Sequence, residues 1–498
     1  MSTTLKLSHR LAKNFWVLGA AAALAACAGE NMIADPTLPD STTTAAADTT
    51  SINAPAPDPK PTTHGGYYAS PSGSSGGDGS QQSPWDLRTA LAGGNGKVQP
   101  GDTVWLRAGT YKGTFSVTVS GASGKPVVFR QYPGEHAIID GASTAKTGTA
   151  LKVQGDWVTL WGFEMTNTNT TRTSSELGNG GRAHALANYA SHTRYISLIV
   201  HDFGVGIYND YHYSDVEIVG CVFYNNGWQG PDRGHGHAIY LRSNTGPVTA
   251  RDNIMFNSFG YGVHVFTNPG EGLLNNIRLE GNVSFNAGGL ANAYPAQNIL
   301  LGGDDRANDD VVKDNMTYFP GSWDATNVRI GYGTLKNGSV DIRNNYFAGG
   351  TTVVSVGYWS SATAAGNTIM GTGKQVTIND PSMASSTFAG QTKSVLPTTT
   401  KVFVRKVPYE AGRVNIVVYN WGKDGSVDVS LDGMLPVGSQ YEIRNVQNLD
   451  GSPVASGTFN GGSVTVPIRA VDAPTPVGWS KHPGTGTEFG AYIVTIRQ

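Results

Sequence analysis

Cysteine and charge are both scarce in this chain. Only two cysteines, Cys27 and Cys221, occur among 498 residues, which excludes a framework of disulfide bonds. Charged residues make up 14% of the sequence and the formal net charge is −2, so no strong field favours nucleic acid or an anionic membrane surface as partner. No Gly-Lys pair is followed by Ser or Thr, which excludes the usual phosphate-binding loop.

The apolar segment near the start of the chain, residues 15–26, is too short to cross a bilayer. It follows Lys6, Arg10 and Lys13 and ends in small residues before Cys27, an order typical of a bacterial lipoprotein signal peptide over residues 1–26. We therefore expect an exported protein anchored by acyl chains on Cys27 to a bacterial membrane, at its outer-membrane, periplasmic or surface face. The alternative is a secretory signal with an incidental cysteine.

The next segment, residues 27–65, is rich in Ala, Thr, Ser, Pro and Asp and predicts a disordered linker. Beyond it, glycine is frequent, with 65 residues in the chain, and short apolar stretches alternate with polar ones, which favours strands and tight turns. Residues 86–91 predict a short helix that would cover the first open sheet edge.

A repeat begins at about residue 157, in which a short strand, a turn and a second short strand recur. One turn position carries Cys221 and then a series of asparagines at steps of 22 to 33 residues: Asn253, Asn282, Asn315, Asn345 and Asn367. Such steps suit a parallel β-helix, where each turn lies on the turn before it. Asn tolerates the left-handed conformation and can donate and accept along a stack, and Phe256 and Phe285 would stack in parallel. Unrelated turn asparagines are the alternative, but they would not share one register.

Three features together resemble the right-handed parallel β-helix proteins of the pectate-lyase-like superfamily: YYASPSGSSGG at 67–77, GDTVWLRAGTY at 101–111, and the Asn-marked coils. The resemblance covers about residues 66 to 390. It implies an all-β fold with a right-handed single-stranded parallel β-helix, here assigned to residues 66–395. Members include polysaccharide lyases, glycoside hydrolases, uronate epimerases and proteins without known catalysis, so the resemblance does not choose among them.

The rhythm of the sequence changes after about residue 395. Residues 396–498 show six or seven alternating strands separated by turns with Gly, Asp or Pro, which predicts a small antiparallel β-sandwich. It is similar to the accessory domains of carbohydrate-active enzymes. Both glycan binding and a cap over the last coil would suit it, and we expect a monomer.

Strands of the repeat predict an outward-facing row of side chains. Ile207, Ile239 and Val263 share one phase and should point inward, so alternation turns the following residues outward. This row contains Tyr208, Tyr240, His264, Leu300 and Arg329. Asp210 and Arg242 lie two positions further along. Aromatic rings and charges on one rigid row can bind an extended sugar chain.

Loops beside this row supply further candidates. The predicted substrate-binding residues are Tyr208, Asp210, His212, Trp228, Arg233 and Arg329. In the segment GHGH, His235 and His237 fall on the same side by alternation. His237 is in phase with the inward residues, so a structural role at a corner is an alternative for it.

Cleavage of an acidic polysaccharide by β-elimination needs three actions: the uronate carboxylate is neutralised, the neighbouring proton is abstracted, and the glycosidic oxygen is protonated. Arg242, Arg233 or Arg329 would neutralise the carboxylate. Tyr240 or His264 would take or give the proton, with His237 and His235 as alternative bases. The sequence therefore predicts a lyase acting on a uronate-containing glycan.

Several alternatives remain open. Asp304 and Asp305, with Asp309 and Asp310, could hold Ca²⁺, or could form an acidic loop that is simply solvated. His235 and His237 could begin a zinc site, but no spacing marks a third ligand. A glycoside hydrolase would need two carboxylates across the bond, drawn from Asp210, Asp232, Asp304 and Asp305. A uronate epimerase would share the lyase residues, and a non-catalytic polysaccharide-binding protein would need none of this chemistry.

Overall fold

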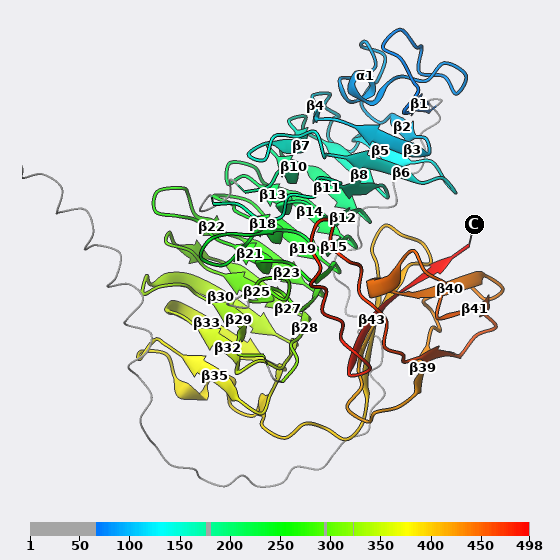
Figure 1. The fold of residues 1–498 in the computed structure, drawn as a ribbon. Helices are drawn as coiled ribbons and strands as arrows, with labels where there is room; N and C mark the ends of the chain where they lie inside the picture. The colour runs from blue at the N-terminus through cyan, green and yellow to red at the C-terminus, as the bar shows by residue number, and fades with distance from the viewer. Residues whose placement is uncertain (1–65, 176–180, 293–295, 322, 498) are drawn as a thin grey trace, which may run out of the picture. The chain divides into compact units, whose positions relative to one another are not determined.

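The computed structural model describes residues 66–497 apart from 176–180, 293–295 and 322. The predicted signal peptide, the linker and Cys27 lie outside these residues. The described chain winds through three long parallel sheets, called A, B and C in the order in which a coil passes through them (Figure 1). No helix among the described residues is both long and apolar enough to cross a membrane.

Sheet A has 11 strands in the described chain. They are β1 (Tyr67–Ala69), β2 (Thr103–Leu106), β5 (Val127–Gln131), β8 (Val158–Trp161), β11 (Thr193–Ile196), β14 (Val216–Val219), β19 (Val248–Arg251), β23 (Ile277–Glu280), β27 (Asp310–Lys313), β30 (Asn337–Arg343) and β33 (Trp359–Ala365).

Sheet B also has 11 strands within the described ranges. They are β3 (Gly109–Lys112), β6 (Ala137–Asp140), β9 (Glu164–Thr166), β12 (Ile199–His201), β15 (Val222–Tyr224), β20 (Ile254–Phe256), β24 (Val283–Phe285), β28 (Met316–Tyr318), β31 (Tyr346–Ala348), β34 (Thr368–Met370) and β36 (Thr392–Lys393).

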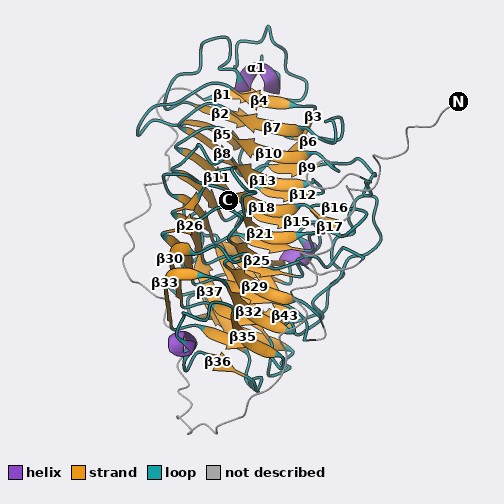
Figure 2. Cartoon of the chain, turned by 90° about the vertical axis from the view of Figure 1, so that its left-hand side faces the viewer, coloured by secondary structure: helices purple, strands orange, loops and turns teal. Residues whose placement is uncertain are grey.

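Sheet C has ten strands in the part that the structure describes. They are β4 (Phe115–Val117), β7 (Thr149–Val153), β10 (His184–Asn188), β13 (Val205–Asn209), β18 (His237–Leu241), β21 (Tyr261–Val265), β25 (Ile299–Leu301), β29 (Thr326–Ile330), β32 (Thr352–Val356) and β35 (Lys374–Ile378). Strands of the three sheets lie one above another along the stack (Figure 2). The predicted right-handed β-helix is confirmed.

Side chains from all three sheets fill the interior of the coil. Ile207, Ile239 and Val263 are fully buried there, as the alternation predicted, together with Phe223 and Ile218 from the other two sheets. Helix α1 (Leu87–Leu91) places Leu87, Ala90 and Leu91 in the same core. It packs against β4 and β1 at the first coil, so the predicted cap is confirmed.

The asparagine stack forms as predicted at the corner between sheets A and B. The Nδ2 of Asn253 donates to Oδ1 of Asn282 at 2.9 Å, and Asn282 donates to Asn315 at 3.0 Å. The series continues through Asn345 and Asn367, and Asn367 donates to Oε1 of Gln391, which the sequence did not mark. Each amide also binds a backbone carbonyl, so these buried polar groups are satisfied.

One expectation about this corner is wrong. The left-handed residue is the one before each ladder position, namely Gly220, Asp252, Gly281, Asp314, Asn344 and Gly366. These residues turn the corner, and the asparagine that follows points its amide into the stack. Cys221 begins the series by accepting a hydrogen bond from the Leu198 N–H. It is free and buried, which raises the pKa of its thiol to about 12.

The C-terminal strands form a five-stranded antiparallel sheet and a two-stranded one, counted over the described residues. The first contains β37 (Lys401–Lys406), β38 (Val414–Tyr419), β43 (Phe489–Ile496), β40 (Gln440–Asn445) and β41 (Ala455–Thr458), and the second contains β39 (Ser426–Ser430) and β42 (Ser463–Pro467). Short elements elsewhere are β16 (Trp228–Gln229), β17 (Gly234–His235), β22 (Leu274–Asn275), β26 (Ala307–Asn308), η2 (Ser385–Phe388) and η3 (Val446–Asn448).

The sandwich covers the outer face of sheet B, so the alternative that it caps the last coil is wrong. Tyr419 and Phe489 pack with Phe256, Phe285 and Tyr318 in one apolar cluster. Phe256 and Phe285 stack at 5.2 Å with nearly parallel rings, as predicted. This contact runs along several coils, and Tyr409 also packs against Trp161 and Ile196 of sheet A. The contacts of the sandwich therefore fall on sheets B and A, whereas the candidate row lies on sheet C.

A buried ionic network joins the β-helix to the C-terminal segment. The Nδ1 of His201 is 2.7 Å from Oδ2 of Asp202, and its Nε2 is 3.1 Å from Oε1 of Glu164. Asp202 also accepts from Arg172 and from the backbone N–H of Val477. Burial alone would lower the pKa of His201, but the two carboxylates outweigh it and raise the pKa to about 9.

Replacing Asn282 with Ala should lower the free energy of unfolding by about 2–4 kcal/mol, because buried donors and acceptors above and below it lose their partner. Urea unfolding measures this change. Asn292→Ala, at an exposed position, is the matched control and should change stability little. A ladder variant as stable as the control would contradict the role given to the stack.

His201 should make stability fall at alkaline pH. Because its pKa is raised in the fold from 6.5 to about 9, its stabilisation is complete below pH 6.5 and is lost as the pH rises through about 9. The full shift corresponds to roughly 3 kcal/mol. Unfolding free energies measured across this pH window should decline in the wild type and stay level in His201→Gln. Parallel curves for both proteins would remove His201 as the cause.

Candidate functional site

The outward row on sheet C lies in register, as predicted. Tyr208 pairs with Tyr240, Tyr240 with His264, His264 with Leu300, and Leu300 with Arg329. Tyr208 and Arg329 are half-buried, whereas Tyr240 is 3% and His264 8% exposed. These residues therefore stack one above another on successive strands. Tyr240 and His264, in the middle of the row, are more buried than the sequence predicted.

His237 lies on the outer face, so its predicted inward phase is wrong. Both Ala238 and Ile239 belong to the interior core, so alternation breaks between them. The neighbouring strands have glycine at the matching position, and a Cβ on Gly206 or Gly262 would point at interior side chains. This double inward step turns His237, and Tyr261 on the next strand, outward beside the file.

His237, His264, Tyr240 and Tyr261 form one aromatic cluster, called the imidazole cluster below. The ring centroids of His237 and His264 are 4.2 Å apart, and Tyr240 lies 5.0 Å from His264. Tyr261 stacks on His264 at 4.4 Å with nearly parallel rings. Two imidazoles and two phenols therefore share one patch, where they can exchange protons with a common ligand.

Both imidazoles of this cluster are neutral at neutral pH. Burial lowers the pKa of His237 and of His264 well below the usual value, and the positive charge of Arg233 lowers both further. In each ring the buried Nδ1 has no hydrogen-bond partner among the described residues. Unpaired buried nitrogens are costly and uncommon, and they mark a place where a ligand can bind.

Tyr240 is tied to a cation and a carboxylate. The Nη2 of Arg242 donates to the Tyr240 hydroxyl at 2.5 Å and to Oε2 of Glu271 at 2.7 Å. Glu271 is held in turn by the side chain and backbone of Asn268. Burial raises the pKa of Tyr240, while Arg242 opposes that rise. Arg242 is thus already ion-paired, which corrects its expected role as the free cation for a substrate carboxylate.

A second polar group lies at the corner between sheets C and A. The Asp210 carboxylate accepts from the Tyr208 hydroxyl at 3.0 Å and lies 2.7 Å from Nδ1 of the exposed His212. Tyr189 and Tyr213, which the sequence analysis missed, are half-buried beside them, with Tyr189 6.3 Å from Tyr208. This aromatic corner can stack on sugar rings.

The loop before β18 forms a small antiparallel hairpin through β16 and β17. Gly236, with φ of 88°, ends it and separates His235 from His237. His235 stays on the hairpin, where its Nε2 is 2.7 Å from Oδ1 of Asp232 and its ring stacks on Trp228. Burial lowers the pKa of His235, and Asp232 opposes this. His235 therefore supports the hairpin instead of joining the imidazole cluster.

Trp228 and Arg233 differ from each other in exposure. Trp228 is fully buried, which contradicts its prediction as a substrate-binding residue. The side chain of Arg233 is 40% exposed, its Nε lies 3.8 Å from Oδ2 of Asp232, and its charge acts on His237, His264 and Tyr261. Arg233 is consequently the accessible cation next to the cluster. Arg329, further along the file, lies over the Tyr332 ring at 5.6 Å.

The acidic loop after β25 is not gathered into one group. Asp310 is buried and accepts from the Ile277 N–H, whereas Asp309 is exposed near Arg278. Burial and the neighbouring Asp305 raise the pKa of Asp304. Nowhere in the described chain do three His, Cys, Asp or Glu side chains lie close enough to hold a metal ion. Ca²⁺ at Asp304 and Asp305 stays a prediction that their placement does not support.

Comparison with known proteins identifies the family of the β-helix. Residues 67–319, just over half of the chain, match the family described as Pel9A-like, right handed beta helix region. The chain belongs to this family. A curated relative, Uncharacterized protein YwoF of Bacillus subtilis (strain 168), is 44% identical over 78 residues, and the match spans only 16% of each protein.

Solved structures similar to this Pel9A-like chain share little sequence with it. Pectate lyase Pel9A is 17% identical with a TM-score of 0.41, covering 64% of this chain and 81% of that one. A rhamnogalacturonan lyase is 17% identical with a TM-score of 0.43, covering 62% and 74%. A GH136 lacto-N-biosidase from Eubacterium ramulus is 10% identical with a TM-score of 0.40, covering 63% and 67%.

Three further residues of the Pel9A-like helix belong to the site although the sequence analysis did not select them. Tyr261 was not selected because strict alternation was assumed. The small residues Gly206, Ala238 and Gly262 were the sequence signal that could have identified it. Glu271 lies on a loop with no motif. His184 begins β10 on the outer side, 6.4 Å from Tyr208, and burial lowers its pKa to about 4.

The neutral state of the cluster can be measured directly. In protein labelled with ¹⁵N-histidine, the rings of His237 and His264 should keep neutral shifts at pH 5.5, where an unperturbed histidine is mostly protonated. Loss of single resonances in His237→Gln and His264→Gln assigns the signals. Fully protonated rings at that pH would contradict the electrostatics described for the cluster.

Proposed function

We propose that this protein is a polysaccharide lyase that cleaves a uronate-containing glycan by β-elimination. The observation that carries this proposal is the pair of neutral imidazoles, His237 and His264, with unpaired Nδ1 atoms beside the Tyr240–Arg242 pair. The family description refers to Pel9A, and the solved structure of that name is a pectate lyase, which supports a carbohydrate substrate.

In this proposal Arg233 pairs with the substrate carboxylate. Its side chain is 40% exposed and lies 3.8 Å from the Asp232 carboxylate, whereas that of Arg242 is 9% exposed and only 2.7 Å from Glu271. Partial neutralisation of the carboxylate acidifies the proton on the adjacent carbon, which an uncharged imidazole can then accept. His264, in register with Tyr240, is the base we favour, and His237 is the alternative.

Tyr240 is the proposed acid. Its hydroxyl is protonated because burial raises its pKa, and Arg242 stabilises the phenolate that remains after donation. The proton goes to the glycosidic oxygen as the carbon–oxygen bond breaks, and the electron pair of the abstracted C–H bond forms the new double bond. Glu271 and Asn268 hold Arg242 in position for this step.

A non-catalytic polysaccharide-binding protein is the second candidate. The half-buried tyrosines Tyr189, Tyr208 and Tyr213 and the low exposure of Tyr240 favour it, because stacking needs no proton transfer. Incubation with uronate polymers separates the candidates. Ultraviolet absorbance of an unsaturated uronate indicates a lyase, new reducing ends without it a hydrolase, altered uronate stereochemistry an epimerase, and binding alone the second candidate.

The location of the protein remains part of the proposal. A lipid on Cys27, with residues 27–65 as tether, would hold the enzyme at a bacterial membrane where exported glycans are within reach. Nucleic acid has no part in this function, and a Ca²⁺ requirement at Asp304 and Asp305 is the least supported element.

Tyr240→Phe and His264→Ala should each lower the turnover of a uronate polymer by roughly 10²-fold or more, because each removes a proton-transfer group. The initial rate of absorbance increase is the measurement. Tyr68→Phe and His482→Ala, which lie outside the cluster, are the matched controls and should keep wild-type rates. Full activity in both cluster variants would place the chemistry elsewhere.

A further inference from the structure

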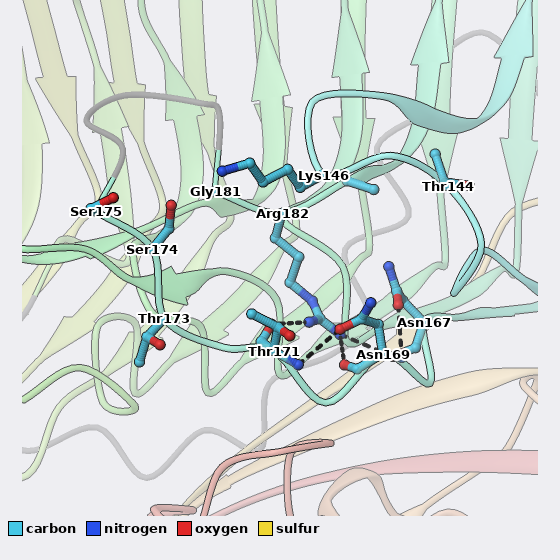
Figure 3. A pocket seen from close by; sticks show the side chains of 11 residues that line it. Thr144, Lys146, Asn167, Asn169, Thr171, Thr173, Ser174, Ser175, Gly181 and Arg182 are labelled. Atoms are coloured by element: carbon cyan, nitrogen blue, oxygen red, sulfur yellow. Dashed lines mark hydrogen bonds between the residues drawn. The ribbon is translucent and has the colours of Figure 1, made fainter.

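A polar cavity of about 390 Å³ lies at the corner between sheets B and C, and the proposed mechanism does not use it. Its lining comes from Thr144 and Lys146, between β6 and β7, and from described residues within 167–175 and 181–183, between β9 and β10 (Figure 3). Thr144, Asn169, Thr171 and Thr173 supply hydroxyl and amide groups to a lining that also contains Lys146 and presents about as much apolar as polar surface. A mixed lining of this kind suits a sugar, which has both hydroxyl groups and apolar C–H faces.

Arg182 holds one wall of the cavity in place through hydrogen bonds to the loop of residues 167–171. Its Nη1 donates to the Thr171 carbonyl, and its Nη2 donates to the carbonyls of Asn167 and Asn169 at 3.0 and 2.8 Å. Figure 3 shows the guanidinium turned toward this loop. Because Arg182 is almost fully buried, the loop is held in one conformation and its side chains are positioned in advance.

The charge behind this wall favours an anionic sugar. The Asp202 carboxylate is hydrogen-bonded to Arg172 and His201, whereas Arg182 reaches only the Asp202 backbone carbonyl. Burial and the nearby positive charge of Arg172 lower the pKa of Arg182 to about 9, against the opposing effect of the Asp202 carboxylate, so Arg182 still carries its charge at neutral pH. A uronate carboxylate in the cavity would partly compensate it.

The cavity lies at the start of β10, on the sheet that carries the imidazole cluster. Ala183 lines it, and the next residue, His184, faces outward and half-exposed on β10. His184 neighbours Tyr208, whose ring lies 5.4 Å from that of Tyr240. Two strand spacings, about 10 Å, separate β10 from β18, and the cavity lies beyond the start of β10, so a sugar chain must extend over more than this distance to occupy both places.

We propose that this cavity is a distal subsite that binds a uronate unit of the same chain whose bond lies at the imidazole cluster. The identity of the sugar rests on the proposed function, but the existence of the subsite does not rest on the reaction. The arrangement makes long oligouronates better ligands than short ones, because only a long chain reaches both places at once.

The test compares dimers and hexamers of galacturonate, of mannuronate and guluronate, and of glucuronate. Thr144→Trp and Thr173→Trp fill the cavity, and Thr144→Ser and Thr173→Ser leave it open as matched controls. The indole variants should weaken hexamer binding by about tenfold, measured by calorimetry on the Tyr240→Phe background, and leave dimer binding unchanged. The serine variants should bind both as the parent does.

A separate absorbance assay on the Tyr240 protein keeps the two proposals distinct. If the Tyr240 protein produces the absorbance of an unsaturated uronate but both indole variants bind the hexamer as the parent does, the subsite proposal is wrong and the lyase proposal is supported. Weakened hexamer binding without absorbance from any polymer would support the subsite and overturn the lyase. Neither binding nor absorbance across the panel would overturn both. Thermal unfolding at the parental temperature shows that the indole variants fold.

Discussion

Coil-on-coil register is the constraint on which every other feature of this molecule depends. Backbone hydrogen bonds between parallel strands fix the spacing, and the amide ladder from Asn253 to Asn367 prevents one coil from slipping against the next. A slip of one residue would turn the interior face outward and leave buried amides unpaired. Residues tens of positions apart in the sequence can therefore form one surface, as Tyr208, Tyr240 and His264 do.

The local departure from this regularity creates the candidate site. Where Gly206, Ala238 and Gly262 begin their strands, two consecutive residues face the interior, which only small side chains at the first of the two positions allow. The residues before them, His237 and Tyr261, therefore point outward. With strict alternation both rings would point into the interior. The candidate site thus depends on one exception to the alternation, repeated in register on three strands.

Sequence reasoning predicted the periodic parts and failed where the period breaks. The Asn ladder, the inward row and the vertical file followed from repeats that are visible in one dimension. His237 was placed inward because nothing in GHGH marks the step at Ala238. Trp228 was predicted to bind substrate because the hairpin that buries it leaves no periodic pattern in the sequence. Ion pairs such as Arg242 with Glu271 join loops of unrelated sequence, so they could not be foreseen.

Three buried histidines on the same scaffold, His201, His237 and His264, show what separates a structural group from a chemically available one. His201 is enclosed by the carboxylates of Asp202 and Glu164, so burial cannot remove its proton and it serves as a fixed cation beneath the C-terminal segment. His237 and His264 are buried to a similar degree, but their charged neighbours are arginines, so they lose the proton and keep a free lone pair. The placement of carboxylates, more than burial itself, therefore sets the charge of each histidine. His201 stays protonated and helps to join the β-helix to the C-terminal segment, whereas His237 and His264 are neutral and can accept a proton.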